Sequence, residues 1–146
     1  MTYFLEKCHS YYDDTTVEKI ILGMQKRYTS FRVNPLKDKG EALEEIKKHN
    51  LKIRKSGIYD NAYILENAKE EDLESLDCYR EGGIYLQSLS SMMPPLKMDL
   101  IPGHAVLDMA AAPGGKTTEM AALSMNKISI TACELNKIRA NRLKFN

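Results

Sequence analysis

Residues 105–134 carry the pattern that most restricts how this chain can fold. AVLDM (105–109) is a short apolar run that ends at an acid, as a buried parallel strand does. A glycine-containing loop then leads into KTTEMAALSM (116–125), which we predict to be a helix with Asn126 near its end. KISITACE (127–134) is a second predicted strand and again ends at an acid. This order of elements is that of the first βαβ unit of a doubly wound, nucleotide-binding sheet.

The loop itself reads DMAAAPGGKTTEM (108–120). Gly114 and Gly115 permit the backbone angles and the close ligand approach that a sharp strand-to-helix turn requires. The first amides of the helix would then face a ligand. Glu134 stands at the tip of the neighbouring strand, where a carboxylate can accept hydrogen bonds from both hydroxyls of a ribose.

The letters GGKTT suggest a phosphate-binding loop, but their spacing argues against one. That motif requires a glycine five positions before the Gly-Lys pair, and here the position holds Ala110. Pro113 removes one amide from the loop, and Asp108 would repel a phosphate. The dinucleotide motif GxGxxG is absent as well. S-adenosylmethionine has no phosphate and carries a cationic sulfonium and a ribose diol, so a loop flanked by two acids favours it over a nucleoside triphosphate.

Residues 1–81 predict a small α+β unit. Its expected strands are SFRVN (30–34), a short LKI segment (51–53) and AYILE (62–66), with a turn at Ser56–Gly57. In SFRVN the alternation of apolar and polar residues predicts a half-buried strand with Arg32 on its exposed face. Four helices are expected in this unit. The first carries Tyr3, Phe4, Cys8, Tyr11 and Tyr12 on one face, and the second is capped by Thr15 and Glu18 and buries Val17, Ile20, Ile21 and Met24. The third runs over 40–50 and ends at Asn50, and the fourth is acidic and is capped by Asn67 with Glu70.

Gly82–Gly83 marks the expected boundary between this unit and a second one over residues 82–146. The second unit begins with a brief strand, a serine-rich helix start and two prolines, and continues into the βαβ unit. It ends with a predicted helix over 136–146 that packs on Ile138 and Leu143. The predicted fold class is therefore α/β: a small α+β domain followed by the first half of a Rossmann-like domain.

Composition restricts the class of protein. Hydrophobic residues make up 43% of the 146 residues and charged residues 28%, which indicates a globular chain. No apolar run approaches the roughly 18–20 residues that span a bilayer, and the N-terminus lacks a signal-peptide pattern, so we expect no membrane association. The three cysteines are far apart, and His9, His49 and His104 share no metal-ligand spacing. These features argue against disulfides and metal sites and fit a cytoplasmic location.

Three segments together resemble the Nop/Sun family of RNA cytosine-5 methyltransferases: YLQSLSSMMPPL (85–96), VLDMAAAPGGKTTEMAAL (106–123) and ACELNKIRANRLKFN (132–146). The AAPGGKT run after VLD is the most specific of these. SFRVNPLK is similar to the strand that the family carries in the small domain before its catalytic domain. Two positions depart mildly from the family pattern: Ala110 stands for a frequent cysteine, and Ser88–Leu89 for an acid-proline pair.

The resemblance implies roles for individual residues. Glu134 would hold the ribose of S-adenosylmethionine, and Arg139 would brace the cofactor strand or meet RNA. Gln87 and the Ser90–Ser91 turn would lie near the active-site side of the sheet. The methionine end of the cofactor would be wrapped by Ala110, Ala111, Ala112, Pro113, Gly114, Gly115 and Lys116. Lys116 would neutralise the cofactor's carboxylate or, alternatively, only begin the helix.

Family chemistry, as the resemblance implies it, needs a cysteine thiolate that attacks carbon 6 of cytosine. The Thr-Cys and Asp-Ala-Pro-Cys segments that would supply the family's cysteines do not occur here. We expect Cys133 to be an inert buried thiol, and neither Cys8 nor Cys78 has a reactive context. No catalytic residue is therefore assigned, and the chain is predicted to be an N-terminal portion of a methyltransferase that is inactive alone.

The expected partner is RNA, with ribosomal RNA favoured over transfer RNA, and neither DNA nor a membrane. KKHNLKIRK (47–55) holds five basic residues that could contact phosphates, joined by Arg32, or could simply be a solvated surface. Tyr3, Tyr11, Tyr12 and Tyr28 are expected in a core or interface. Two other hypotheses stay open: a non-catalytic RNA-binding module with a cofactor-like loop, and an NTPase, for which no Walker B strand occurs.

Overall fold

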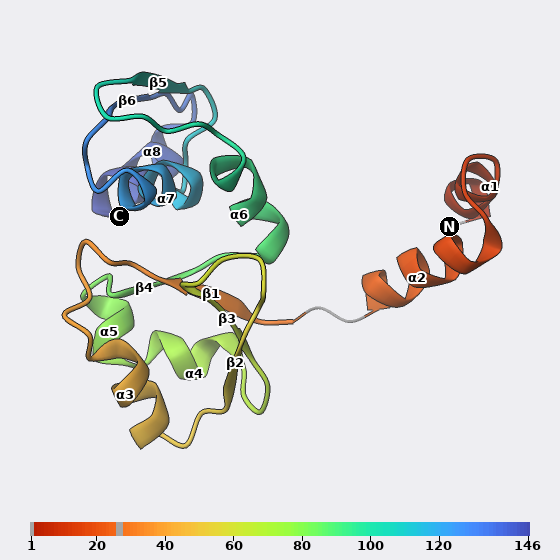
Figure 1. Cartoon of the computed structure of the whole chain (residues 1–146), viewed down its shortest axis with the longest axis horizontal. Helices are drawn as coiled ribbons and strands as arrows, with labels where there is room; N and C mark the ends of the chain where they lie inside the picture. The colour runs from red at the N-terminus through yellow and green to blue at the C-terminus, as the bar shows by residue number, and fades with distance from the viewer. Residues whose placement is uncertain (1, 26–27) are drawn as a thin grey trace.

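The computed structural model describes residues 2–25 and 28–146. Its elements form a helical pair, a four-stranded sheet with helices on one side, and a smaller parallel unit on the other side (Figure 1). The predicted α/β class is confirmed. Among the described residues, no helix is long and apolar enough to cross a membrane.

Helices α1 (Thr2–His9) and α2 (Asp14–Gln25) pack on each other and stand apart from the other elements in Figure 1. Cys8 and Val17 are buried. The cap of α2 differs from the predicted Thr15, because the Asp13 carboxylate accepts hydrogen bonds from the amide and the hydroxyl of Thr16, both at 2.9 Å. The burial predicted for α2 is wrong for Met24, which is exposed, and Ile20 and Ile21 are only half-buried. Tyr3, Phe4, Tyr11, Tyr12 and Tyr28 are exposed, so the core alternative for the tyrosines is wrong and the interface alternative stays a prediction.

The antiparallel sheet has the strand order β2-β3-β1-β4. Its strands are β2 (Ile53–Lys55), β3 (Ala62–Leu65), β1 (Ser30–Val33) and β4 (Ile84–Leu86). Phe31 stacks on Tyr63 with ring centroids 5.5 Å apart and lies in the core that faces α3 (Ala42–Lys48), α4 (Glu70–Glu74) and α5 (Asp77–Arg80). The expected end of α3 is confirmed, since Asn50 adopts a left-handed φ of 58° directly after it.

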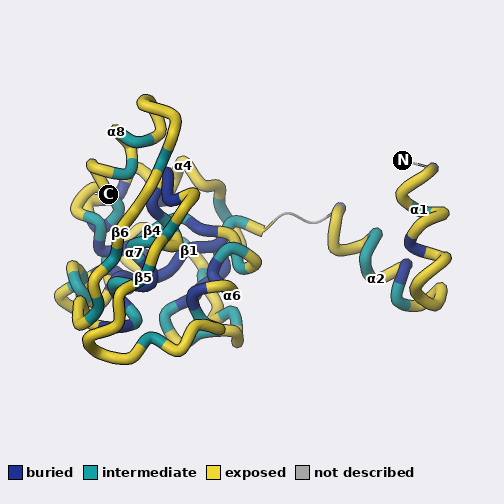
Figure 2. Tube along the Cα trace, turned by 90° about the horizontal axis from the view of Figure 1, so that it is seen from above, coloured by how far each residue is buried: buried dark blue, intermediate teal, exposed yellow. Residues whose placement is uncertain are grey.

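Strand β1 is buried on both faces, which overturns the half-buried prediction. Arg32, expected on an exposed face beside the basic residues, is only 1% exposed. The physical reason is tertiary: β1 is a central strand, and helix α7 (Gly115–Leu123) of the second unit covers the face that carries Arg32. Figure 2 shows the buried positions gathering around β1, between the sheet and the elements that cover it.

Two further local predictions need correction. Asn67 does not cap α4: its side chain accepts from the Lys52 amide at 2.7 Å and donates to the Asn50 carbonyl at 3.0 Å. The N-terminus of α4 is instead capped by Asp72, whose carboxylate accepts from the Lys69 amide at 2.8 Å. Gly82, with a φ of 78°, follows α5 as predicted, yet the strand beyond it completes the N-terminal sheet. The division into domains at 81/82 stays a prediction, with β4 on the N-terminal side of the structure.

The second unit contains the expected βαβ arrangement. Strands β5 (Ala105–Asp108) and β6 (Ser129–Ala132) are parallel, and α7 (Gly115–Leu123) connects them. Helices α6 (Leu89–Leu96) and α8 (Lys137–Phe145) flank this unit (Figure 1). The expected full burial of the first strand is wrong, because Leu107 is 59% exposed in a sheet that has two strands among the described residues. Cys133 and Ile138, also predicted to be buried, are exposed, while Leu143 is half-buried.

Candidate functional site

The loop between β5 and α7 is held at the tips of both parallel strands. The Asp108 carboxylate accepts from the Thr117 hydroxyl at 2.7 Å and from the Ala110 amide at 3.3 Å. On the other side, the Ala111 amide donates to the Cys133 carbonyl at 3.0 Å, and the Cys133 amide donates to the Asp108 carbonyl at 2.8 Å. The acid that ends the first strand therefore shapes the loop, and the end of β6 fixes the loop's position.

The two glycines of the loop serve different purposes. Gly114 is the N-cap of α7 with a φ of 119°, a conformation that side chains rarely adopt. A Cβ on Gly115 would lie 3.3 Å from Gln87 Oε1 and 3.4 Å from Tyr85 Cε1. The expected need for an unusual backbone angle is therefore confirmed at Gly114. At Gly115 the close approach is to the N-terminal sheet, because Tyr85 lies in β4 and Gln87 directly follows that strand.

Glu134 lies beyond the tip of β6 and is fixed in place by two neighbours. Its Oε1 accepts from the Asn136 amide at 2.9 Å, and its Oε2 is 3.3 Å from Arg139 Nη1. Arg139 also donates through Nη2 to the Ala112 carbonyl. The Glu134 side chain is only 7% exposed. Arg139 thus links the acid to the loop, which agrees with a bracing role.

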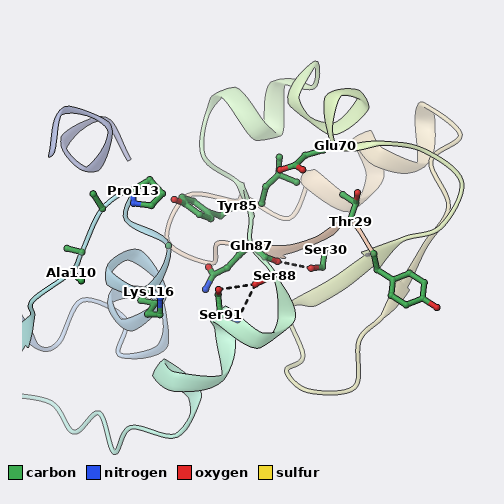
Figure 3. A pocket seen from close by; sticks show the side chains of 15 residues that line it. Thr29, Ser30, Glu70, Tyr85, Gln87, Ser88, Ser91, Ala110, Pro113 and Lys116 are labelled. Atoms are coloured by element: carbon green, nitrogen blue, oxygen red, sulfur yellow. Dashed lines mark hydrogen bonds between the residues drawn. The ribbon is translucent and has the colours of Figure 1, made fainter. Parts of the chain in front are cut away.

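An open pocket of about 500 Å³ separates the loop from the edge of the N-terminal sheet. Figure 3 shows Ala110, Pro113 and Lys116 on the loop side, with Tyr85, Gln87 and Ser91 on the other. Ser88 caps α6, and its hydroxyl lies 2.9 Å from the Ser91 hydroxyl. Of the predicted cofactor residues, this pocket is lined by Ala110, Ala111, Ala112, Pro113, Gly115 and Lys116, whereas Gly114, Glu134 and Arg139 are not in its wall.

A buried polar network that the sequence analysis missed lies directly behind this pocket. Arg32 donates through Nε to Gln87 Oε1 at 3.0 Å, and the Gln87 amide nitrogen donates to Glu119 Oε2 at 2.7 Å. Arg32 also donates through Nη2 to the Gly115 carbonyl at 3.2 Å and to the Thr118 hydroxyl at 2.7 Å. The network thus joins strand β1 to the first turn of α7.

Both charged members of this network are almost fully buried, Arg32 at 1% and Glu119 at 0% exposure. Burial raises the pKa of the Glu119 carboxyl to about 7, although the Gln87 hydrogen bond and the Arg32 charge oppose the shift. Burial also lowers the pKa of Arg32. One signal was available in the sequence, because Glu119 follows Gly115 by four residues and therefore shares its helix face.

The other predicted groups lie away from the pocket. The basic residues of segment 47–55 are all exposed, on α3, on β2 and between them, and we call them the basic cluster: Lys47, Lys48, Lys52, Arg54 and Lys55. Arg54 pairs with Glu66 at 3.0 Å. Cys8 and Cys78 are buried, and burial raises the pKa of Cys78 to about 12. Within residues 2–25 and 28–146, no group of three or more His, Cys, Asp or Glu side chains could hold a metal ion.

Comparison with known proteins connects this site to a family. Residues 95–146 match the model of the 16S rRNA methyltransferase RsmB/F family. Over 90% of its length the chain is 34% identical to the 25S rRNA (cytosine-C(5))-methyltransferase NSUN5 of Arabidopsis thaliana, and over 80% it is 33% identical to the tRNA (cytosine(49)-C(5))-methyltransferase of Pyrococcus abyssi. The chain belongs to the Nop/Sun family.

Solved structures agree with this placement. A methyltransferase homolog from Pyrococcus horikoshii is similar to this Nop/Sun chain with a TM-score of 0.68 and 28% identity, over 100% of this chain and 54% of the other. NSun6 from the same organism, solved with SFG, has a TM-score of 0.76 over 96% of this chain and 60% of its own. At 19% identity that second likeness shows the fold alone. The chain spans 23% of the Arabidopsis relative and 38% of the Pyrococcus abyssi relative.

Proposed function

We propose that this Nop/Sun chain forms the methyl-donor site of an S-adenosylmethionine-dependent RNA cytosine-5 methyltransferase. The observation that carries the proposal is the loop over 110–116, held between two strand tips with Glu134 tied to it through Arg139. The relatives' names, which specify methylation of cytosine carbon 5 in rRNA and tRNA, support the reaction. A neighbour in the same fold was solved with SFG, an analogue of S-adenosylmethionine, which supports the donor.

The side chains present fit such a donor. Ala110, Ala111 and Ala112 leave room beside the loop, and the exposed Lys116 can neutralise a carboxylate. Glu134 Oε1 accepts one hydrogen bond from its own chain and Oε2 is in an ion pair with Arg139, so both oxygens keep a lone pair for a ribose hydroxyl. Arg139 and the Asn136 amide hold that carboxylate before any ligand arrives, which lowers the cost of ordering it on binding. When bound, the donor supplies an electrophilic methyl group.

We assign donor binding, and not attack on the cytosine, to this chain. The three cysteines do not line the pocket, and the raised pKa of Cys78 keeps its thiol protonated at neutral pH. The thiolate that the family's chemistry requires would come from the remaining length of such proteins. We accordingly expect the 146 residues alone to bind the donor without methylating RNA. We propose a cytoplasmic location, consistent with three free thiols.

RNA is the partner that we propose, and the family description favours ribosomal RNA. The exposed cluster of Lys47, Lys48, Lys52, Arg54 and Lys55 offers a surface for phosphates. The same cluster favours a second candidate function, an RNA-binding module whose loop no longer takes a cofactor. The two candidates differ in one respect that can be measured directly, because only the first predicts uptake of S-adenosylmethionine or its analogues.

The test is a calorimetric titration of the purified protein with S-adenosylhomocysteine. Glu134→Ala should weaken binding by about 1–3 kcal/mol, the loss expected for hydrogen bonds to a charged group. Glu66→Ala, which removes a surface carboxylate that also pairs with an arginine, should leave the affinity unchanged. Arg139→Met keeps the Glu134 carboxylate but removes its brace, and should have a smaller effect. Wild-type protein that takes up no ligand would reject donor binding, and an unchanged Glu134→Ala affinity would reject the ribose assignment.

A further inference from the structure

Arg32 connects the N-terminal sheet to the loop that we assign to the methyl donor. It lies in the central strand β1, where its backbone pairs with Ala62 of β3 and Tyr85 of β4. Its guanidinium also lies over the Tyr85 ring, 5.0 Å from the centroid. Two neighbouring strands and an aromatic face therefore restrict where this side chain can point.

We propose that Arg32 is a positioning residue for the methyl-donor loop, holding the first turn of α7 through the Gly115 carbonyl and the Thr118 hydroxyl. Both acceptors are bound by the same guanidinium nitrogen, at 3.2 Å and 2.7 Å. Thr118 extends this chain of hydrogen bonds, because its hydroxyl donates to the Gly114 carbonyl at 2.7 Å. Two successive hydrogen bonds therefore connect Arg32 to Gly114, the N-cap residue of the helix that begins at the loop.

Gln87 fixes the plane of the guanidinium. Its side-chain oxygen accepts from Arg32 Nε, its side-chain nitrogen donates to Glu119, and its backbone is tied to Ser30 through two hydrogen bonds of 2.8 and 3.1 Å. Gln87 also lines the pocket beside Lys116. The sheet, the loop and one wall of the pocket therefore share a single set of hydrogen bonds.

Stability alone is a poor explanation for such a network. Burying a guanidinium and a carboxyl costs several kcal/mol each, and well-packed apolar residues in their place are often as stable or more so. Arg32 Nη1 and Glu119 Oε1 are buried without a hydrogen-bond partner among the described residues, so part of that cost is not recovered. What the network does supply is geometry: a planar fork of donors defines the distance and angle between β1 and α7.

The inference rests on the proposed function, since it assumes that the loop binds the donor. Arg32→Lys keeps the charge but cannot reach Gln87 and Thr118 together. We expect it to raise the dissociation constant for S-adenosylhomocysteine about tenfold, the effect of losing one hydrogen bond to a charged group. Hydrogen exchange of the amides over 110–118 should become faster, while that of β1 and β3 stays unchanged. Arg80→Lys, at an exposed arginine of the N-terminal unit that pairs with Asp77 and does not line this pocket, is the matched control.

Thr118 provides a second route to the same test, with a milder change to the core. Thr118→Val removes the hydroxyl and should reproduce the loss of affinity, whereas Thr118→Ser keeps the hydroxyl and should restore it. The Arg32→Lys and Thr118→Val changes combined should cost no more than either alone, because they remove the same interaction.

The outcomes separate the two proposals. Wild-type protein that fails to bind S-adenosylhomocysteine overturns the proposed function. Wild-type protein that binds, together with Arg32→Lys and Thr118→Val variants of unchanged affinity and loop exchange, overturns only the positioning role. Variants with a lowered melting temperature but wild-type affinity for S-adenosylhomocysteine would also overturn the positioning role, since Arg32 would then contribute only to stability.

Discussion

Glu119→Gln should remove a pH dependence from the stability of this protein. The carboxyl is fully buried and faces Arg32 of β1, Gln87 beyond β4 and the charge of Lys116 on its own helix. Its pKa is about 7 in the folded protein against an ordinary value of 4.5. Between these two values the folded state binds more protons than the unfolded state. The free energy of unfolding therefore falls as the pH rises through this range.

The size of the effect follows from the same two values. At about 1.4 kcal/mol per pH unit, the difference between 4.5 and about 7 corresponds to about 3 kcal/mol. This contribution is fully present below pH 4.5 and is lost above pH 7. Glutamine keeps an oxygen that accepts the Gln87 hydrogen bond and has no proton to lose. Glu119→Gln should therefore match the wild type near pH 5 and exceed it by about 3 kcal/mol near pH 8.

Urea unfolding at pH 5, 6, 7 and 8, followed by circular dichroism, measures this difference directly. Glu66→Gln is the control, because this exposed carboxylate pairs only at the surface. A difference in the free energy of unfolding between Glu119→Gln and wild type that stays constant from pH 5 to 8 would refute the assignment of a raised pKa to this carboxyl. That constant difference is also the result expected if Arg32 keeps Glu119 ionised in the folded protein, because the carboxyl is then deprotonated in both states throughout this range.

Two other predictions concern the loop and the basic surface. Gly114→Ala should lower the free energy of unfolding by about 1–3 kcal/mol, because φ is 119° and the new Cβ would lie 3.3 Å from Leu143 Cδ1. Gly103→Ala, at a φ of 90° with open space around it, measures the backbone contribution alone in the same thermal melts. Changing Lys52, Arg54 and Lys55 to glutamine should weaken the binding of single-stranded RNA. The slope of the logarithm of the binding constant against the logarithm of the salt concentration should become shallower by about 0.7 for each phosphate that is no longer neutralised. A triple change at Lys19, Lys97 and Lys127, outside the cluster, should do neither, and equal weakening in both variants would point to net charge instead of a defined surface.

Patterns among neighbouring residues were enough to predict several parts of the fold. The βαβ unit follows from two apolar runs, a glycine turn and a helix pattern within 30 residues, and the structure contains it. Gly114 could be assigned because a sharp turn into a helix requires an angle that only glycine adopts readily. The resemblance to a methyltransferase family followed from this segment together with the short motifs over 85–96 and 132–146. In each case the information lies among neighbours in the chain.

The surroundings of Arg32, by contrast, depend entirely on tertiary packing. An arginine in an alternating strand is normally placed on the solvent face, and this expectation failed because α7, more than 80 residues later in the chain, covers that face. The pairing of β4 with β1 across Gly82–Gly83 and the network through Gln87 and Glu119 were unpredictable for the same reason. Their partners are distant in sequence, and the favourable contacts exist only once both units have packed together.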